Sequence, residues 1–152
     1  MKTIQTILKK DKTRIRTQFN NYLTELSEFD PTITFVDGVL QYRWFDYYWI
    51  DDDRFPFELI IDGIRAGFAF VRKLSDTNHE IAEFYVEPNF RGGGNALWFA
   101  SELVKKFGGT FEFSTRIENV RAIKFWDKFC KNYVITNRSE NNDYVDWTIK
   151  IK

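Results

Sequence analysis

The sequence predicts an α/β fold of the α+β type, in which helices flank a mixed, mostly antiparallel sheet. Three observations support this class. Apolar residues recur every three or four positions near the N-terminus, two β-like runs flank an Asp-Gly turn near the middle, and strand-like and helix-like segments alternate after it. With 152 residues, of which 43% are hydrophobic, the chain has the size of a single domain, residues 1–152, that can bury a core.

The first half of the chain predicts one helix and one hairpin. The helix runs from about Asp11 to Phe29, because its apolar side chains share one face. Short β-like runs with an Asp37-Gly38 turn follow it, up to residue 55. Phe57 to Lys73 then reads as two antiparallel strands joined by a tight turn at Asp62-Gly63.

The second half predicts alternating strands and helices that end in a hairpin. Gly108-Gly109 stops the first of these helices, and Asn119 is a possible cap for the second. The predicted elements are, in order, a strand His79 to Val86, a helix Ala96 to Phe107, a strand Thr110 to Thr115, a helix from Asn119 through Phe129, and strands Tyr133 to Asn137 and Tyr144 to Ile151.

Composition limits the possible partners. The 22 basic and 22 acidic side chains give zero net charge, which argues against a protein held to nucleic acid by general positive charge. The N-terminus lacks the apolar run of a signal peptide, and no stretch approaches the ~18 apolar residues of a membrane span. We therefore expect a cytoplasmic protein without nucleic-acid or membrane partners. A single histidine, His79, expected in a surface turn, and a single cysteine, Cys130, expected in the core, argue against a metal site.

The segment Phe84 to Leu97 carries the strongest functional signal. It leads from a strand, through three consecutive glycines, into a helix. Unpaired N–H groups and the positive end of the helix dipole meet at such a point, and glycine lets a phosphate approach the backbone. The segment therefore predicts a site for a phosphorylated ligand, although a glycine-rich turn without a ligand is the alternative.

Two motifs resemble the signatures of the GNAT superfamily of N-acetyltransferases. R-x-x-G-x-A is filled by Arg91, Gly94 and Ala96, and N-x-x-A-x-x-F-W is filled by Asn119, Ala122, Phe125 and Trp126. The resemblance covers roughly residues 57–133. It implies the GNAT fold, acetyl-CoA as cosubstrate, and direct acetyl transfer to the primary amine of a small-molecule or peptide acceptor.

The resemblance also implies where the cofactor lies. The strand ending at Val86 and the strand Thr110 to Thr115 would splay apart, with the pantothenate arm between them. Asn119 would hydrogen-bond this arm or merely cap its helix, and Trp126 would contact the cofactor or only pack. The remaining implied contacts are backbone groups of Phe84, Tyr85 and Val86 for the arm, and Arg91, Gly92, Gly93, Gly94, Asn95 and Ala96 for the pyrophosphate, with the Arg91 side chain as a further phosphate ligand.

Acetyl transfer to an amine needs a base, and two glutamates are candidates. Glu83 is the first choice, because it lies in an apolar run where burial would raise its pKa. Glu80 lies three positions earlier and is therefore expected on the opposite face, so that only one of the two points at the thioester. The alternative for either carboxylate is a surface ion pair with a neighbouring Arg or Lys. Trp126 stands where the family often has a tyrosine, which leaves Tyr133, Tyr85 or water as the proton source.

The segment Tyr42 to Asp53 is the predicted acceptor-recognition region, because aromatic faces and aspartates together suit a cation. The alternative is that the aromatics are core and that the aspartates are a solvated loop. Two other functional classes remain open: a non-catalytic acyl-CoA-binding or sensing domain, and a protein-interaction module. A homodimer formed through the C-terminal hairpin is possible.

Overall fold

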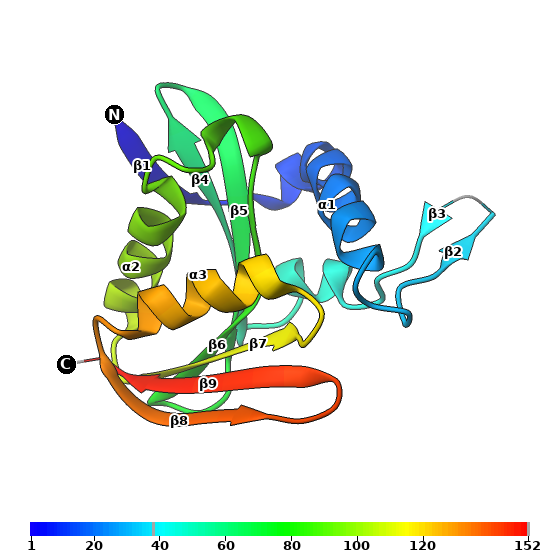
Figure 1. Ribbon diagram of the computed structural model, residues 1–152. Helices are drawn as coiled ribbons and strands as arrows, with labels where there is room; N and C mark the ends of the chain where they lie inside the picture. The colour runs from blue at the N-terminus through cyan, green and yellow to red at the C-terminus, as the bar shows by residue number, and fades with distance from the viewer. Residues whose placement is uncertain (38, 152) are drawn as a thin grey trace.

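The computed structural model describes residues 1–37 and 39–151. Its centre is a seven-stranded sheet in the order β1-β4-β5-β6-β7-β9-β8, in which only β6 and β7 run parallel (Figure 1). This arrangement confirms the predicted mixed, mostly antiparallel sheet. The strands are β1 (Lys2–Thr6), β4 (Arg54–Ile61), β5 (Ile64–Lys73), β6 (Asn78–Val86), β7 (Thr110–Arg116), β8 (Val134–Glu140) and β9 (Tyr144–Lys150).

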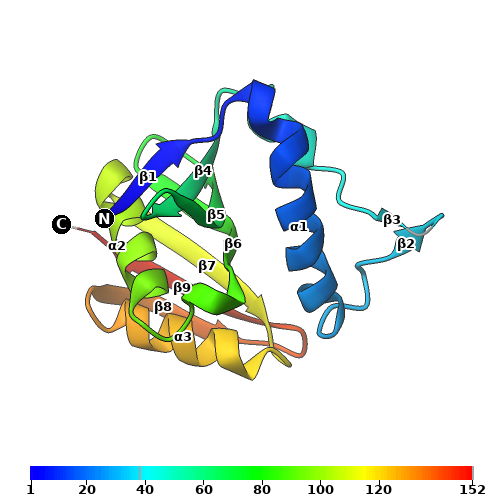
Figure 2. The ribbon, with the colours of Figure 1, turned by 90° about the horizontal axis from the view of Figure 1, so that it is seen from above.

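Helices cover both faces of the sheet. Viewed from above, α1 (Lys12–Ser27) lies on one side, and α2 (Asn95–Phe107) and α3 (Val120–Cys130) lie on the other (Figure 2). Each side has its own apolar core, because alternate residues of β5 and β6 point to opposite faces. Phe68, Phe70 and Tyr85 pack under α1, whereas Val71 and Ile81 pack under α2 and α3.

The predicted helices and hairpin are confirmed within a few residues. The helix expected from Asp11 is α1, and the hairpin is β4–β5, in which Asp62 and Gly63 have φ values of 50° and 81°. A buried glutamate of β4 also fixes α1 to the sheet. Glu58, 1% exposed, accepts hydrogen bonds from Arg14 of α1 at 3.2 and 3.3 Å.

The segment between α1 and β4 differs most from the prediction. It contains a small separate hairpin, β2 (Phe35–Val36) and β3 (Val39–Leu40), which projects from the body beside α1 (Figure 1), and a 3₁₀ helix η2 (Phe45–Trp49). Gly38 of the predicted turn lies outside the described residues. The aromatic run is therefore a helical turn and not the β-like run expected there. The sequence prediction also omitted β1, which extends the sheet beyond β4.

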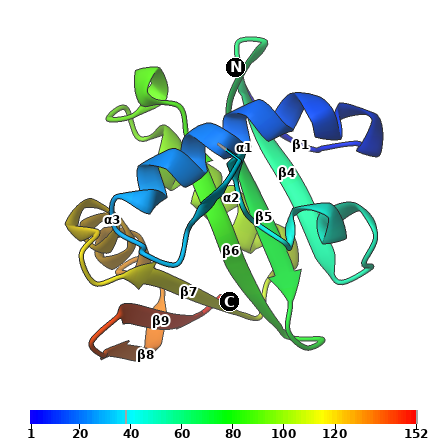
Figure 3. The ribbon, with the colours of Figure 1, turned by 90° about the vertical axis from the view of Figure 1, so that its right-hand side faces the viewer.

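Strand β6 has two irregularities that shape the centre of the molecule. Phe70 of β5 pairs with Glu83, whereas its neighbour Val71 pairs with Ile81, so Ala82 is an extra residue in a β-bulge. On its other side, β6 pairs with β7 at only three positions, the last being Glu80 with Glu112. Beyond that point β7 stays paired with β9, as it is along its whole length, and the two parallel strands diverge (Figure 3).

No helix among the described residues is long and apolar enough to cross a membrane.

Candidate active site

The glycine turn leads directly into α2. A short 3₁₀ helix, η3 (Pro88–Phe90), precedes the turn. Gly92 and Gly94 have φ values of +88° and +82°, a backbone conformation that residues with a side chain rarely adopt. Gly94 is the N-cap of α2. No atom lies within 4 Å of a Cβ built on either residue, so the space over the turn is open. Because Gly94 has no side chain to cap the helix, the first N–H groups of α2 remain available to an anion.

Arg91 is held by protein groups. Its Nε donates to the Val86 carbonyl oxygen at 2.8 Å, and its Nη2 lies 3.0 Å from both carboxylate oxygens of Glu25 in α1. The guanidinium also lies over the Tyr85 ring. These contacts tie α1 to the end of β6, so the side chain predicted as a phosphate ligand is already paired.

A first cavity, of about 320 Å³, opens between the glycine turn and α3. Its lining comes from the end of β6 and the glycine turn, from α3, and from α1 and the residue Phe29 that follows it. The lining includes Phe84, Val86, Gly92 and Ala96, then Asn119 and Trp126, and finally Tyr22, Glu25, Leu26 and Phe29. We call it the α3-side cavity. Arg121, in the first turn of α3, also lines it, and the sequence analysis missed this residue because no motif position marks it.

Two predicted contacts of this cavity have structural roles. The Asn119 side chain accepts a hydrogen bond from the Ala122 N–H at 3.2 Å and thereby caps α3. Trp126 is buried, with its ring 4.5 Å from that of Phe113. Capping by Asn119 and packing by Trp126 are therefore both present, and both side chains also line the cavity.

A second cavity, of about 270 Å³, occupies the gap where β6 and β7 diverge. It is lined by residues of both faces of the sheet: Tyr22 and Glu83 from the α1 side, and Phe84 and Trp126 from the α3 side. This gap cavity is also lined by Tyr144, at the start of β9, which no sequence motif indicated. The predicted splay is thus present, and it connects the two sides of the sheet.

Glu83 stands at the inner end of this gap in a partly buried position. Burial raises the pKa of its carboxyl from 4.5 to about 7, although hydrogen bonds from Tyr22 and Tyr42 act in the opposite direction. The Tyr22 hydroxyl donates to Oε2 of Glu83. Burial and the neighbouring Glu83 charge in turn raise the pKa of Tyr22 and Tyr42. A carboxyl with a pKa near neutrality suits a general base.

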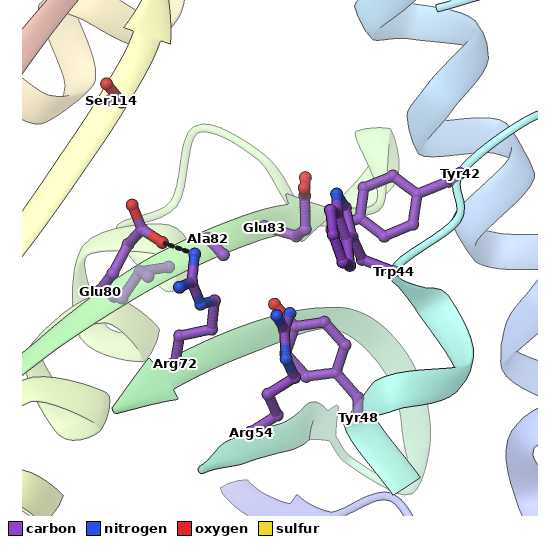
Figure 4. A pocket seen from close by; sticks show the side chains of 10 residues that line it. Tyr42, Trp44, Tyr48, Arg54, Arg72, Glu80, Ala82, Glu83 and Ser114 are labelled. Atoms are coloured by element: carbon purple, nitrogen blue, oxygen red, sulfur yellow. Dashed lines mark hydrogen bonds and ion pairs between the residues drawn. The ribbon is translucent and has the colours of Figure 1, made fainter. Parts of the chain in front are cut away.

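The prediction that Glu80 and Glu83 lie on opposite faces is wrong. The extra residue at Ala82 breaks the alternation of side chains, so both glutamates point to the α1 face and line the same cavity (Figure 4). Glu80 lies 3.4 Å from Arg72, and burial nevertheless raises its pKa.

This third cavity, of about 370 Å³, is the α1-side cavity. Tyr42, Trp44 and Tyr48 of the predicted acceptor region line it, together with Arg54 and Arg72 (Figure 4). The aspartates of that region do not. Asp51 lies 3.4 Å from Arg54 outside the lining, and the carboxylates of this cavity come from Glu80 and Glu83.

Three other expectations need correction. Tyr133, a predicted proton source, follows the C-terminal end of α3, whereas Asn119 lies at the other end of this helix, which is roughly 16 Å long. Its ring packs on Phe129, and it lines none of the three cavities. Tyr85, the other tyrosine predicted as a proton source, packs under α1, and its hydroxyl donates to the Glu87 carboxylate. His79 is not in a surface turn, because it is a residue of β6 that is 6% exposed. The centroid of its ring lies 4.5 Å from that of Phe107. Cys130 is buried, as expected.

Solved structures place this arrangement in a known fold. The ribosomal-protein-S18-alanine N-acetyltransferase from Escherichia coli matches with a TM-score of 0.66 and 15% identity, over 100% of this chain and 95% of that one. An N-acetyltransferase from Staphylococcus aureus Mu50 gives 0.68 and 19%, over 100% and 99%. The spermidine N-acetyltransferase from Vibrio cholerae gives 0.66 and 13%, over 98% and 95%. The fold is therefore that of the GNAT N-acyltransferases.

The sequence itself gives the family. The model of the acetyltransferase (GNAT) family matches residues 19–131, and the chain belongs to this family. The match begins within α1, well before residue 57, where the motif resemblance started. No curated protein matches the chain. Within the described ranges 1–37 and 39–151, no group of three or more His, Cys, Asp or Glu side chains could hold a metal ion.

Proposed function

We propose that the protein is an acetyl-CoA-dependent N-acetyltransferase that transfers the acetyl group directly to a primary amine. The observation that carries this proposal is the position of Glu83, which lines both the gap cavity and the α1-side cavity. The pyrophosphate would bind at the glycine turn, and the pantetheine arm would lie in the α3-side cavity with its thioester in the gap. The acceptor amine would reach the thioester from the α1 side.

Glu83 would make the amine nucleophilic. An alkyl ammonium has a pKa near ~10, so it must lose a proton before it can attack. In the proposed step Glu83 takes that proton, the amine nitrogen forms a bond to the thioester carbon, and the carbon–sulfur bond breaks to leave CoA as a thiolate. Because the pKa of Glu83 is about 7, the residue is largely ionised in mildly alkaline solution and can act as this base.

The departing thiolate needs a proton, and Trp126 cannot supply one. Tyr144 is our proposed donor, because it lines the gap cavity together with Trp126 and Glu83. Tyr22 also lines the gap, but its hydroxyl donates to Glu83 and its pKa is raised well above 10. Tyr144 thus replaces Tyr133 in this role.

Calorimetric titration with acetyl-CoA tests the cofactor site. Gly94→Trp should abolish binding, because the new side chain fills the open space over the turn. Gly63→Trp is a matched control. Gly63 has nearly the same φ, +81° against +82°, and equally open surroundings, but it lies in the β4–β5 turn. Loss of binding in both variants would mean that backbone strain is the cause.

Release of free CoA thiol with amine acceptors then tests catalysis. Tight binding with amine-dependent thiol release supports the proposal, and Glu83→Gln should lower kcat by about 10²–10⁴-fold. Binding without turnover of any amine would instead indicate an acyl-CoA-binding or sensing domain. A folded protein that binds no acetyl-CoA would favour the protein-interaction module.

A further inference from the structure

We propose that the acceptor carries an anionic group, a carboxylate or a phosphate, which binds at Arg54 and Arg72 while its amine lies at Glu83. This inference rests on the proposed function, because it describes the acceptor of the same site. It narrows the acceptor from any primary amine to an amine that also bears an acid group.

The sheet register places the two arginines directly beside each other. Arg54 of β4 pairs with Arg72 of β5, and Arg72 in turn pairs with Glu80 of β6. All three side chains line the α1-side cavity (Figure 4). Neighbouring strands are about 4.8 Å apart, and like charges directly opposite each other destabilise a sheet. An anion between the two guanidinium groups would relieve this repulsion.

The protein only partly neutralises this pair. The Nε of Arg54, whose side chain is 14% exposed, lies 3.4 Å from Oδ2 of Asp51 and makes an ion pair there without an aligned hydrogen bond. The contact of Arg72 with Glu80 is a single long hydrogen bond of 3.4 Å. Each arginine thus has one long contact to a carboxylate, and an acid group of a ligand in the cavity would add charge-assisted hydrogen bonds to this pair.

Aromatic rings hold the Arg54 guanidinium in place. Its Cζ lies 5.4 Å from the centroid of the Trp44 ring and 5.2 Å from that of Tyr48. These cation–π contacts leave the in-plane N–H groups, which bind carboxylate and phosphate, to face other partners. The aromatic cluster therefore orients an arginine, and this role differs from the direct contact with a cationic acceptor that the sequence suggested.

The cavity therefore presents two guanidinium groups, with Glu80 beside Arg72, and the carboxyl of Glu83 apart from them. An acceptor with an ammonium and an acid group matches both the arginine pair and Glu83. A polyamine does not, because its second ammonium would lie against Arg54 and Arg72. The spermidine N-acetyltransferase from Vibrio cholerae, solved with CoA and spermine, shares the fold, so the fold alone does not decide between these two kinds of acceptor.

Paired acceptors test the inference in the thiol-release assay. γ-Aminobutyrate is compared with butylamine, and O-phosphoethanolamine with ethanolamine, so that carboxylate and phosphate are separate arms; spermine is the third arm. We expect at least one acid-bearing amine to exceed its partner without the acid group by about tenfold or more in kcat/KM, since charge-assisted hydrogen bonds are strong. If the amines without an acid group, or spermine, react equally well or better, the inference is overturned but the proposed function remains intact.

Arg54→Gln and Arg72→Gln should remove this preference, mainly through a KM at least tenfold higher for the acid-bearing amine. Lys73→Gln is the matched control, since Lys73 follows Arg72 on β5 with the same 41% side-chain exposure and pairs with Asp76. Unchanged acetyl-CoA affinity shows that each variant is folded. If Arg72→Gln does not fold, Arg72→Lys takes its place, because it keeps the positive charge of the side chain. An unchanged preference in the folded variants would also overturn the inference.

A measurement without turnover uses inorganic phosphate as the probe. Phosphate should raise the melting temperature of the CoA-saturated protein and should fail to do so in Arg54→Gln and Arg72→Gln. Saturation with CoA keeps the phosphate from the glycine turn. An equal shift in parent and variants, or none in the parent, would contradict the inference, whereas failure of the parent to bind acetyl-CoA would sink the proposed function itself.

Discussion

Replacement of Glu83 by Gln should change how the stability of the protein depends on pH. In the unfolded chain its carboxyl titrates near 4.5, whereas in the folded protein burial raises the pKa to about 7. Between these two values the folded protein binds the extra proton, so the free energy of unfolding falls as the pH rises through this window. At about 1.4 kcal/mol per pH unit, the rise in pKa corresponds to a loss of at most about 3 kcal/mol.

Urea unfolding at a series of pH values between 4.5 and 8 measures this effect. Over this range the free energy of unfolding of the parent should fall by up to about 3 kcal/mol more than that of Glu83→Gln. The variant therefore becomes more stable relative to the parent as the pH rises. Gln keeps an oxygen that can accept the hydrogen bond from Tyr22. Glu102→Gln, on the surface of α2, is the matched control and should behave as the parent. Parallel pH profiles for the parent and Glu83→Gln would refute the assignment of a raised pKa to this carboxyl.

Three further outcomes follow from the same site. The kcat/KM of the parent should rise with pH through an apparent pKa of about 7, and Glu83→Gln should lack this limb. Tyr144→Phe should lower kcat while leaving the acetyl-CoA affinity unchanged; an unaltered kcat would leave water as the proton source. Gly67→Ala should destabilise the protein by about 1–3 kcal/mol in urea unfolding and weaken acetyl-CoA binding, because its Cβ would lie 2.2 Å from the Tyr85 carbonyl oxygen. Gly93→Ala, whose Cβ would meet only the Asn95 side chain at 3.9 Å, should cost far less stability.

Local patterns predicted most of the secondary structure. The apolar stripe of α1, the Asp62-Gly63 turn and the Gly108-Gly109 stop each depend on neighbours in the sequence, and each is present in the structure. The glycine turn was predicted for the same reason, since a strand, three glycines and a helix specify where the N–H groups point. The family match confirms the assignment that the motifs suggested.

The arrangement of the two glutamates could not be predicted in this way. Alternation along β6 assigns Glu80 and Glu83 to opposite faces, and only the extra residue at Ala82 brings them together. A β-bulge depends on pairing with β5, which an alanine in an apolar run does not reveal. The pairing of Arg54 with Arg72 likewise requires the register of β4 and β5, which lie on either side of a turn.

Long-range packing explains the remaining errors. His79 was assigned to a polar turn, yet its strand position turns it toward Phe107 of α2. Tyr133 is one of the tyrosines predicted to replace the missing proton donor, but it follows the end of α3 that is far from Asn119. Tyr144 and Arg121 belong to the site because β9 and α3 border the gap, and no local pattern marks either residue.

The bulge and the divergence of β6 from β7 act together on the proposed chemistry. Pairing with β7 ends at Glu80, so the backbone of β6 beyond it has no strand partner on that side. Backbone N–H and C=O groups in the middle of a sheet need partners, and an extended ligand arm can supply them as an added strand would. The bulge lies at the start of the same segment and turns Glu83 toward the α1 face. One irregular strand therefore provides both the opening for the cofactor arm and the orientation of the proposed base.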